Sequence, residues 1–390
     1  MRSIVFIASA ALVVACSDGE SPPGADGGAA PTGAGTLGAA GYQCVLRESR
    51  AVLSGGPEGI AAGTPWFSRG PSGLRAYTRS PSRDLRWNDG RRDHAVPADL
   101  MFFAGQLGWT GERYIAAPGA PTPPEGLEFD GVNPDTRDNL RLFSYDAAFG
   151  DARTLRAGLP ANACGLRITE MPGRVLVTWI RRGSDGCFGG EPLMMLLGAR
   201  GEVIVPPRAL ADDNSDYVNI QTLTARWDFG HAVITGRGGR TYTWVVDTSG
   251  EVLRREFGGD VACLRHGCAR LRIESENSAG GGVGGNSLRF DPLYDGTAQS
   301  TQTYRVHVQI PSLSALSVSG DRLLLLRAAE PTGCDLTVVD VTQRTVVAEL
   351  RDETMSACDD AHVRATPRGF ALAATDPVAG AVSRSLDCTR

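Results

Sequence analysis

Two stretches of equal length decide which fold this sequence predicts: GRVLVTWIRRGSDGC at 173–187 and GDRLLLLRAAEPTGC at 320–334. Each starts at a glycine, continues as an apolar run, passes through a polar turn and ends on Gly-Cys. A second match places an Ala-Cys pair, ending at Cys164 or Cys358, before an apolar run, a turn and another apolar run. One pattern recurring along a chain indicates internal repeats of a structural unit.

The repeated unit has the composition of β-strands. Short runs rich in Val, Ile, Leu, Thr, Tyr and Trp are separated by Gly, Pro, Asp and Asn, and no convincing amphipathic helix interrupts them. The run TYRVHVQI at 303–310 alternates polar and apolar residues, which is the period of a half-buried strand. The chain is therefore predicted to be all-β.

Turn sequences of similar type follow these runs, and their first residues lie 45 to 57 residues apart. They are found at 89–90, 146–150, 198–201, 247–250, 295–296 and 340–343. A unit of about 50 residues is the size of one four-stranded propeller blade. Over residues 42–390 this period predicts a β-propeller of six or seven blades, and the alternative is two β-sandwich domains.

The segment LGWTGERYIAA at 107–117 supports the propeller prediction. Its Trp109, Gly111 and Tyr114 resemble the W-x-G-x-x-Y strand signature of degenerate propeller repeats in secreted bacterial proteins. The resemblance implies a repeat domain of this class and indicates no specific family.

The first residues have the features of an export signal. Met1-Arg2 precedes an apolar stretch at 4–14, which is too short to span a bilayer comfortably. It ends in LVVAC at 12–16, which resembles the lipobox of bacterial lipoproteins. The resemblance implies that residues 1–15 are removed and that Cys16 carries the acyl chains that anchor the protein.

The residue after Cys16 and the segment that follows it indicate where in the cell envelope the protein is held. Ser17, rather than Asp, favours the outer membrane over the inner membrane by resemblance to enterobacterial sorting. Residues 16–41 are dominated by Gly, Ala, Pro, Ser and Thr, so they are predicted to be a flexible tether. We therefore expect a lipid-anchored protein of the cell envelope with the repeat domain at 42–390.

Without Cys16, the nine cysteines leave an even set, which predicts up to four disulfides in an exported protein. A propeller must close its ring or expose unpaired strand edges, so a Cys44–Cys388 bridge would lock an N-terminal strand into the last blade. The other predicted pairs are Cys164–Cys187, Cys263–Cys268 and Cys334–Cys358. The alternative joins Cys358 to Cys388 and Cys44 to Cys334. A metal site at Cys263 and Cys268, near His266, is less favoured.

Composition excludes several functions. The formal charge of −5 argues against a nucleic-acid partner. The sequence contains no lysine, which excludes a P-loop and Schiff-base chemistry. Neither HExxH nor GxSxG occurs, so no local motif for hydrolysis is present and no catalytic residue is predicted.

Two loops are weak candidates for ligand sites. The segment 130–138 carries oxygen donors suited to calcium, although a solvated acidic loop is the favoured interpretation: Asp130, Asn133, Asp135 and Asp138. The segment 83–94 gathers arginines around a tryptophan, and such a cluster could hold a carboxylate or an acidic sugar: Arg86, Trp87, Arg91 and Arg92. A charged loop between strands is the plainer interpretation.

The absence of a catalytic motif favours a membrane-tethered binding or scaffold module outside the cytoplasm. Its partners would be the membrane, through the lipid, and an envelope protein or glycan. The alternative is a propeller enzyme acting on glycan or a related polymer. A propeller has a central channel. Carboxylates that converge at the mouth of this channel would favour the enzyme, whereas an apolar or arginine-aromatic rim around the mouth would favour binding.

Overall fold

The structure is a computed structural model, and the chain divides into the units Met1–Pro31 and Thr32–Arg390. The residues it describes all lie in the second unit: 43–48, 66–79, 85–88, 93–97, 100, 106–117, 140–159, 163–183, 186–210, 220–257, 259–265, 267–275, 286–293, 303–308, 315–329, 333–353, 355, 362–376 and 380–389. Among these residues no helix is long and apolar enough to cross a membrane.

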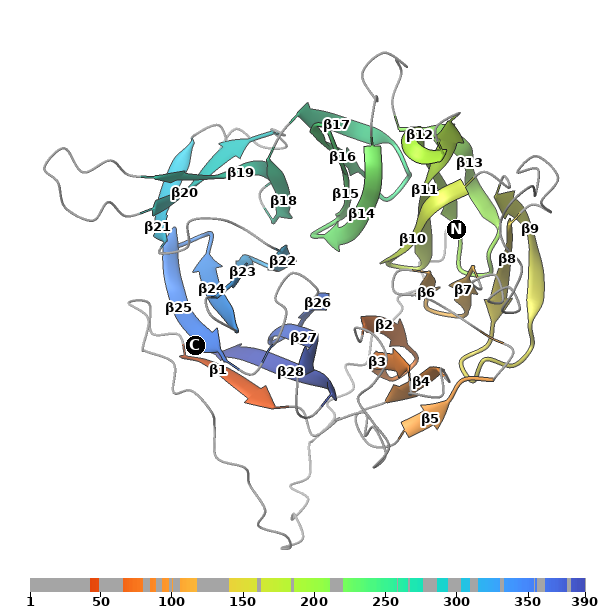
Figure 1. The fold of residues 1–390 in the computed structure, drawn as a ribbon, viewed down its shortest axis with the longest axis horizontal. Helices are drawn as coiled ribbons and strands as arrows, with labels where there is room; N and C mark the ends of the chain where they lie inside the picture. Colours follow the sequence, from red (N-terminus) through yellow and green to blue (C-terminus); the bar gives the residue numbers. More distant parts are fainter. Residues whose placement is uncertain are drawn as a thin grey trace, which may run out of the picture. The chain divides into compact units, whose positions relative to one another are not determined.

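The second unit forms seven antiparallel sheets of four strands, arranged as the blades of a β-propeller (Figure 1). Blade 1 contains β2 (Trp66–Gly70), β3 (Gly73–Arg79), β4 (Leu85–Asn88) and β5 (Asp93–Ala95). Blade 2 contains β6 (Leu107–Trp109), β7 (Tyr114–Ala116), β8 (Leu140–Tyr145) and β9 (Arg153–Leu159). Blade 3 contains β10 (Ala163–Met171), β11 (Arg174–Gly183), β12 (Gly186–Leu197) and β13 (Val203–Ala209).

The remaining blades repeat this order around the ring. Blade 4 contains β14 (Ile220–Asp228), β15 (His231–Gly238), β16 (Thr241–Val246) and β17 (Val252–Phe257). Blade 5 contains β18 (Asp260–Leu264), β19 (Gly267–Ser275), β20 (Asn286–Pro292) and β21 (Tyr304–Val308). Blade 6 contains β22 (Ala315–Ser319), β23 (Arg322–Ala328), β24 (Cys334–Asp340) and β25 (Thr345–Asp352). Blade 7 contains β26 (His362–Thr366), β27 (Gly369–Asp376), β28 (Gly380–Thr389) and β1 (Gln43–Glu48).

The propeller prediction is confirmed with seven blades, and the two-sandwich alternative is wrong. The repeated stretches coincide with equivalent strands: 173–187 contains β11 and 320–334 contains β23, each the second strand of its blade. The turns that begin at Asp146 and Asp247 join the third strand to the fourth. In both, the aspartate side chain accepts backbone N–H groups within the turn, at 2.7 to 2.9 Å.

The core consists of apolar clusters between neighbouring blades. Each of the seven interfaces around the ring has its own cluster. Phe290, between blades 5 and 6, and Phe370, between blades 6 and 7, are fully buried. Burying one such side chain contributes about 1.5–3 kcal/mol, so stability depends on packing at every interface.

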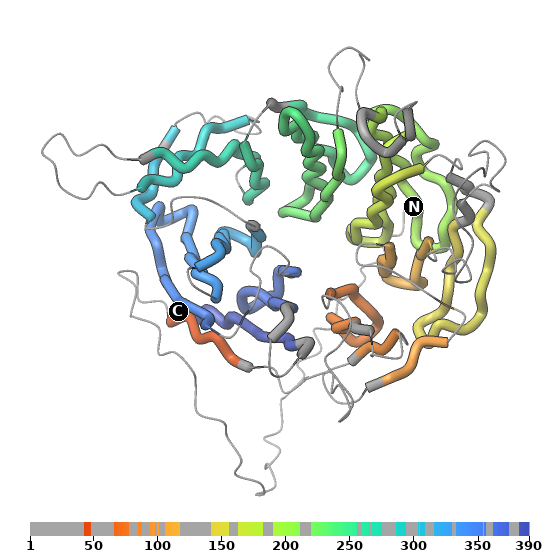
Figure 2. The backbone as a smooth tube through the Cα atoms, in the orientation of Figure 1, coloured from red at the N-terminus to blue at the C-terminus, as the bar shows by residue number. Residues whose placement is uncertain are grey.

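Blade 7 joins the two ends of the domain. β1 pairs antiparallel with β28, and a disulfide links Cys44 to Cys388. Figure 2 shows the red N-terminal strand beside the blue strands of this blade. The predicted ring closure is confirmed, and the alternative that pairs Cys388 with Cys358 is wrong.

The other cysteines support an oxidised framework. Cys263 and Cys268 form the predicted disulfide. Cys164 and Cys334 are also disulfide-bonded. The side chains of their predicted partners, Cys187 and Cys358, lie outside the described residues, so those two pairings stay predictions.

Candidate functional site

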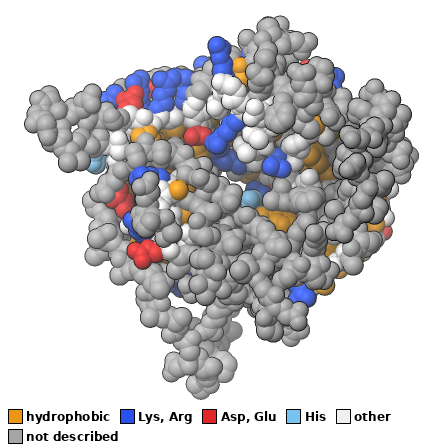
Figure 3. Space-filling model, in the orientation of Figure 1, with side chains coloured by type: hydrophobic (Ala, Val, Ile, Leu, Met, Phe, Trp, Pro, Cys, Tyr) orange, Lys and Arg blue, Asp and Glu red, His pale blue; other side chains and the backbone are white. Residues whose placement is uncertain are grey.

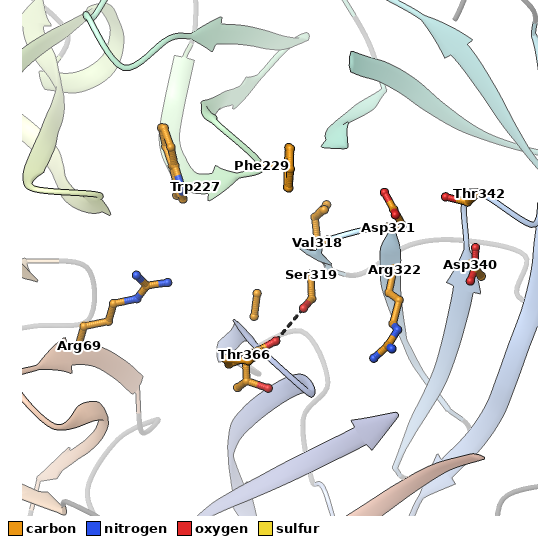
Figure 4. Close-up of a pocket in the computed structure, with 13 residues that line it drawn as sticks. Arg69, Trp227, Phe229, Val318, Ser319, Asp321, Arg322, Asp340, Thr342 and Thr366 are labelled. Carbon is orange, nitrogen blue, oxygen red and sulfur yellow. Dashed lines mark hydrogen bonds between the residues drawn. The ribbon is translucent and has the colours of Figure 1, made fainter. Parts of the chain in front are cut away.

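A pocket of about 740 Å³ opens where the first hairpins of several blades turn. Its lining residues come from blades 1, 4, 6 and 7, at or beside the β2–β3, β14–β15, β22–β23, β24–β25 and β26–β27 turns (Figure 4). Each first strand lies on the inner side of its blade, so its hairpin turn lies near the centre of the ring (Figure 1). The fold therefore gathers side chains that are far apart in the sequence.

Arg69 brings a positive charge to this pocket from blade 1. Its backbone N–H donates to Oε1 of the buried Glu170 at 2.8 Å, and the same oxygen accepts the Trp109 N–H at 2.9 Å and the Ser68 hydroxyl at 2.5 Å. This carboxylate thereby ties the inner strands of blades 1, 2 and 3 together. Within the described chain, the guanidinium of Arg69 is exposed and has no hydrogen bond or ion pair, and it points into the pocket in Figure 4.

Blade 4 provides an aromatic wall. Trp227 is the last residue but one of β14 and is partly buried. Phe229 lies in the turn that follows, with 46% of its surface exposed. A large exposed apolar side chain inside a pocket indicates a binding surface, because water contact with the ring is unfavourable. The rings stand across the pocket from Arg69 (Figure 4).

The carboxylates of the pocket already have partners. Asp340 is 2% exposed, and its Oδ1 accepts the Gln343 N–H at 2.8 Å. An oxygen of Asp321 lies 3.9 Å from a guanidinium nitrogen of Arg265. Arg322 also lines this side, where its Nη1 donates to the carbonyls of Arg368 and Cys388 at 3.1 and 2.8 Å. The charge left without a partner in the described lining is therefore that of Arg69.

Hydroxyl groups complete the polar lining. The Ser319 hydroxyl donates to the carbonyl of Thr366 at 2.8 Å, which links the first hairpins of blades 6 and 7 (Figure 4). Thr342 adds another hydroxyl on the side of Asp340. Such groups can fix the orientation of a polar ligand by hydrogen bonding.

The inner strands of blades 3 and 7 also carry basic groups. His362 on β26 accepts the Phe67 N–H through Nδ1 at 3.1 Å. Burial, together with the charges of Arg364 and Arg167, lowers the pKa of His362 to about 3. Among the residues that the structure describes, buried Nε of Arg364 has no hydrogen-bond partner. Figure 3 shows arginine side chains and a histidine among apolar side chains near the centre of the ring.

The predicted arginine-tryptophan loop is only partly described. Trp87 on β4 is buried, its ring stacks on His94 with centroids 4.0 Å apart, and the guanidinium of Arg75 lies 3.7 Å from its centre. Arg86 is exposed on the same strand. Arg91 and Arg92 lie outside the described residues, so a ligand role for this loop stays a prediction.

Two other predicted sites fall outside the described residues. They are the lipid-bearing Cys16 and the calcium loop with Asp130, Asn133, Asp135 and Asp138. The sequence did not single out Arg69 or Phe229. Their common signal is position, because each lies at the end of a first strand or in the turn after it, beside a glycine.

Comparison with known proteins identifies no family for this chain. No family model matches the chain, and neither does any curated protein. Among solved structures, the chain is similar to the BBS1N part of a BBS1N–ARL6DN complex, with 10% identity, a TM-score of 0.47, and coverage of 88% of this chain and 96% of that one.

Two further solved structures have comparable similarity. A polysaccharide lyase of family PL25, described as an ulvan lyase, has 12% identity and a TM-score of 0.46, with 84% and 94% of the two chains covered. The Cps50 (Swd1) β-propeller domain of Myceliophteria thermophila has 10% identity and a TM-score of 0.43, with 84% and 98% covered.

Proposed function

We propose that this protein is a membrane-tethered binding module outside the cytoplasm, and that its pocket binds an anionic ligand with an apolar or ring-shaped face. The observation that carries the proposal is the exposed Arg69 guanidinium facing the aromatic wall of Trp227 and Phe229. A guanidinium binds carboxylate or phosphate through a planar fork of donors. An aromatic face binds the apolar side of a sugar ring or of a similar group.

The size and electrostatics of the pocket fit this ligand class. A volume of about 740 Å³ lies within the range of small-molecule sites. Arg167 on β10 and Arg364 on β26 bring further positive charge to the inner strands, and both add to the effect of burial in lowering the pKa of His362. An acidic saccharide or another carboxylate-bearing envelope component would pair with the arginine charge and pack on the aromatic rings of the pocket.

The envelope location rests on the sequence and on the disulfides. An N-terminal apolar stretch that ends in a lipobox-like LVVAC predicts export and acylation at Cys16. The bridges Cys44–Cys388 and Cys263–Cys268 are typical of proteins that fold in an oxidising compartment. The Gly- and Pro-rich segment 16–41 would hold the propeller away from the lipid.

Catalysis on a glycan is the less favoured function. Glycosidic cleavage needs two carboxyl groups that flank the scissile bond. The described carboxylates of the pocket both come from blade 6, Asp321 from the β22–β23 turn and Asp340 from the end of β24. Asp340 is buried and accepts a backbone N–H. The arrangement therefore suits recognition better than acid-base chemistry.

A paired set of ligands tests this proposal. The full chain in detergent would be titrated with uronic-acid oligosaccharides and with neutral oligosaccharides of the same length. We expect binding of the acidic set that weakens as salt increases, since exposed charges are screened. Equal binding of both sets, or binding of neither set, would contradict the proposal.

A further inference from the structure

Two arginines lie at the same height where blades 1 and 7 meet. The inner strands β2 and β26 are neighbours, with Cα atoms of the two strands within 8 Å of one another. The backbone N–H of Phe67 on β2 donates to Nδ1 of His362 on β26 at 3.1 Å, so these two residues lie side by side. All blades share one strand order around the ring, so their first strands run in the same direction (Figure 1). Two residues further along, Arg69 therefore lies opposite Arg364.

Strand alternation places both arginines on the sides of blades 1 and 7 that face each other. Residues two apart on a strand share a face, so Arg69 shares the face of Phe67, and Arg364 shares the face of His362. Phe67 packs against alanines of β27 in blade 7, and its ring centroid lies 6.2 Å from that of His362. The turns that follow β2 and β26 both line the pocket (Figure 4). The two arginines are therefore placed to act on one ligand.

Neither charge has a counter-ion within the described part of the chain. Arg69 is exposed and Arg364 is partly buried, and no described group forms a hydrogen bond or an ion pair with either guanidinium. Glu170 accepts the backbone N–H of Arg69 and not its side chain. Arg167 on β10 adds a third cation, since burial and then the charges of Arg364 and Arg167 lower the pKa of His362. Like charges repel when no counter-ion separates them, so this cluster favours a ligand group with more than one negative charge.

We propose that Arg69 and Arg364 together bind a phosphoryl group, and that the ligand of the pocket is a phosphorylated sugar. This inference rests on the proposed function and names the charged group of its ligand. A phosphate monoester carries a charge of about −1.5 to −2 near neutral pH and three strong acceptor oxygens. Two guanidinium forks can use these oxygens at once, whereas a single carboxylate matches one fork.

The rest of the pocket suits the ring of such a ligand. Trp227 and Phe229 stand across the pocket from Arg69 (Figure 4), and an aromatic face can pack on the apolar side of a sugar ring. Thr342 adds a hydroxyl that can bind a sugar hydroxyl. Inorganic phosphate would contact the arginines alone, so it should bind more weakly than a sugar phosphate.

Ligands that share one ring and differ in charge test the phosphoryl group. The full chain in detergent would be titrated by calorimetry, in phosphate-free buffer, with glucose 6-phosphate, glucuronate, glucose and inorganic phosphate. We expect glucose 6-phosphate to bind about tenfold or more tightly than glucuronate, because it gains a further charged hydrogen bond. Equal affinities for these two would overturn the phosphoryl assignment and leave the proposed function standing, whereas failure of every acidic ligand to bind would contradict both. Inorganic phosphate that binds as tightly as the sugar phosphate would overturn the sugar assignment.

The Arg364→Gln variant tests the second arginine. We expect it to weaken binding of glucose 6-phosphate about tenfold or more and to change binding of glucuronate less, so that the preference for phosphate shrinks. Arg47→Gln, on β1 outside the pocket lining, should keep the wild-type affinities for both ligands. An unchanged preference in Arg364→Gln would overturn the proposal. Circular dichroism checks that this variant folds, and if it does not, the exposed Arg69→Gln must lose the preference in its place.

Discussion

Cys44 and Cys388 lie directly opposite each other across β1 and β28 and are joined by a disulfide, although they are 344 residues apart in sequence. The bridge connects the strand that begins the domain to the strand that ends it. Because β1 completes the sheet of blade 7, separating these ends would expose the edge of β28. The disulfide therefore holds the whole ring of blades closed.

Removing this bridge should destabilise the propeller more than removing the local one. A disulfide restricts the unfolded chain more when it closes a longer loop, and loss of a native bridge typically costs about 2–5 kcal/mol. We expect Cys44→Ser/Cys388→Ser to lower the melting temperature further than Cys263→Ser/Cys268→Ser, whose cysteines are five residues apart. Thermal unfolding followed by circular dichroism gives the comparison. Equal melting temperatures for the two variants would argue against the ring-closing role.

A second link between blades 6 and 7 is a buried ion pair. Nη1 of Arg384 on β28 lies 2.6 Å from Oδ2 of Asp352 on β25, and the two side chains are 4% and 1% exposed. Asp352→Ala would leave the guanidinium buried without its charge partner, which costs about 3–5 kcal/mol. The exposed pair Glu112–Arg200 is the control, and Glu112→Ala should cost about 0–1 kcal/mol. Denaturant unfolding measures both, and similar losses in the two variants would contradict this account.

His362 should make the fold sensitive to acid. Its folded-state pKa of about 3 lies below the value near 6.5 of an unfolded histidine, so the unfolded chain takes up the proton first. The contribution of neutral His362 to the free energy of unfolding is fully present above about pH 6.5. It is lost as the pH falls towards 3, by on the order of 1 kcal/mol per pH unit. His362→Gln, which can still accept the Phe67 N–H, should reduce this slope.

The control for that slope is His307→Gln, which replaces an exposed histidine on β21. It should keep the wild-type dependence of unfolding free energy on pH. If His362→Gln shows the same dependence as both the wild type and His307→Gln, then His362 does not titrate as proposed.

The proposed anchor at Cys16 has a direct consequence for fractionation. The thiol of Cys16 would carry the lipid, so Cys16→Ser should move the protein from the membrane fraction to the soluble fraction. Mass spectrometry of the wild type should find an acylated Cys16 as the first residue. A mature N-terminus elsewhere, or an unmodified Cys16, would rule the anchor out.

The fold was predictable because the repeat length of about 50 residues can be recognised from turn residues that act locally. Turns between third and fourth strands begin with residues such as Asp247, whose side chain accepts nearby backbone N–H groups, and this effect needs no distant partner. The closing bridge was predictable as well, because a ring must join its ends and Cys44 and Cys388 lie at the ends of the domain.

The pocket was not predictable, because its parts come from blades far apart in sequence. Arg69 and Phe229 belong to blades 1 and 4, and Thr366 belongs to blade 7. Strand alternation indicates which face a side chain takes, whereas proximity across the ring depends on the number of blades and the angle between them. Trp87 shows the same limit, since the sequence does not reveal that Arg75 and His94 cover its ring.

Titration calorimetry of Arg69 variants tests the central claim most directly. The acidic oligosaccharide that binds the wild type would be titrated into Arg69→Gln and into Arg47→Gln, which changes an exposed arginine on β1 outside the pocket lining. A charged hydrogen bond contributes about 1.5–3 kcal/mol, so we expect Arg69→Gln to weaken binding about tenfold or more and Arg47→Gln to leave it unchanged. Equal affinity in both variants would contradict a pocket built around Arg69.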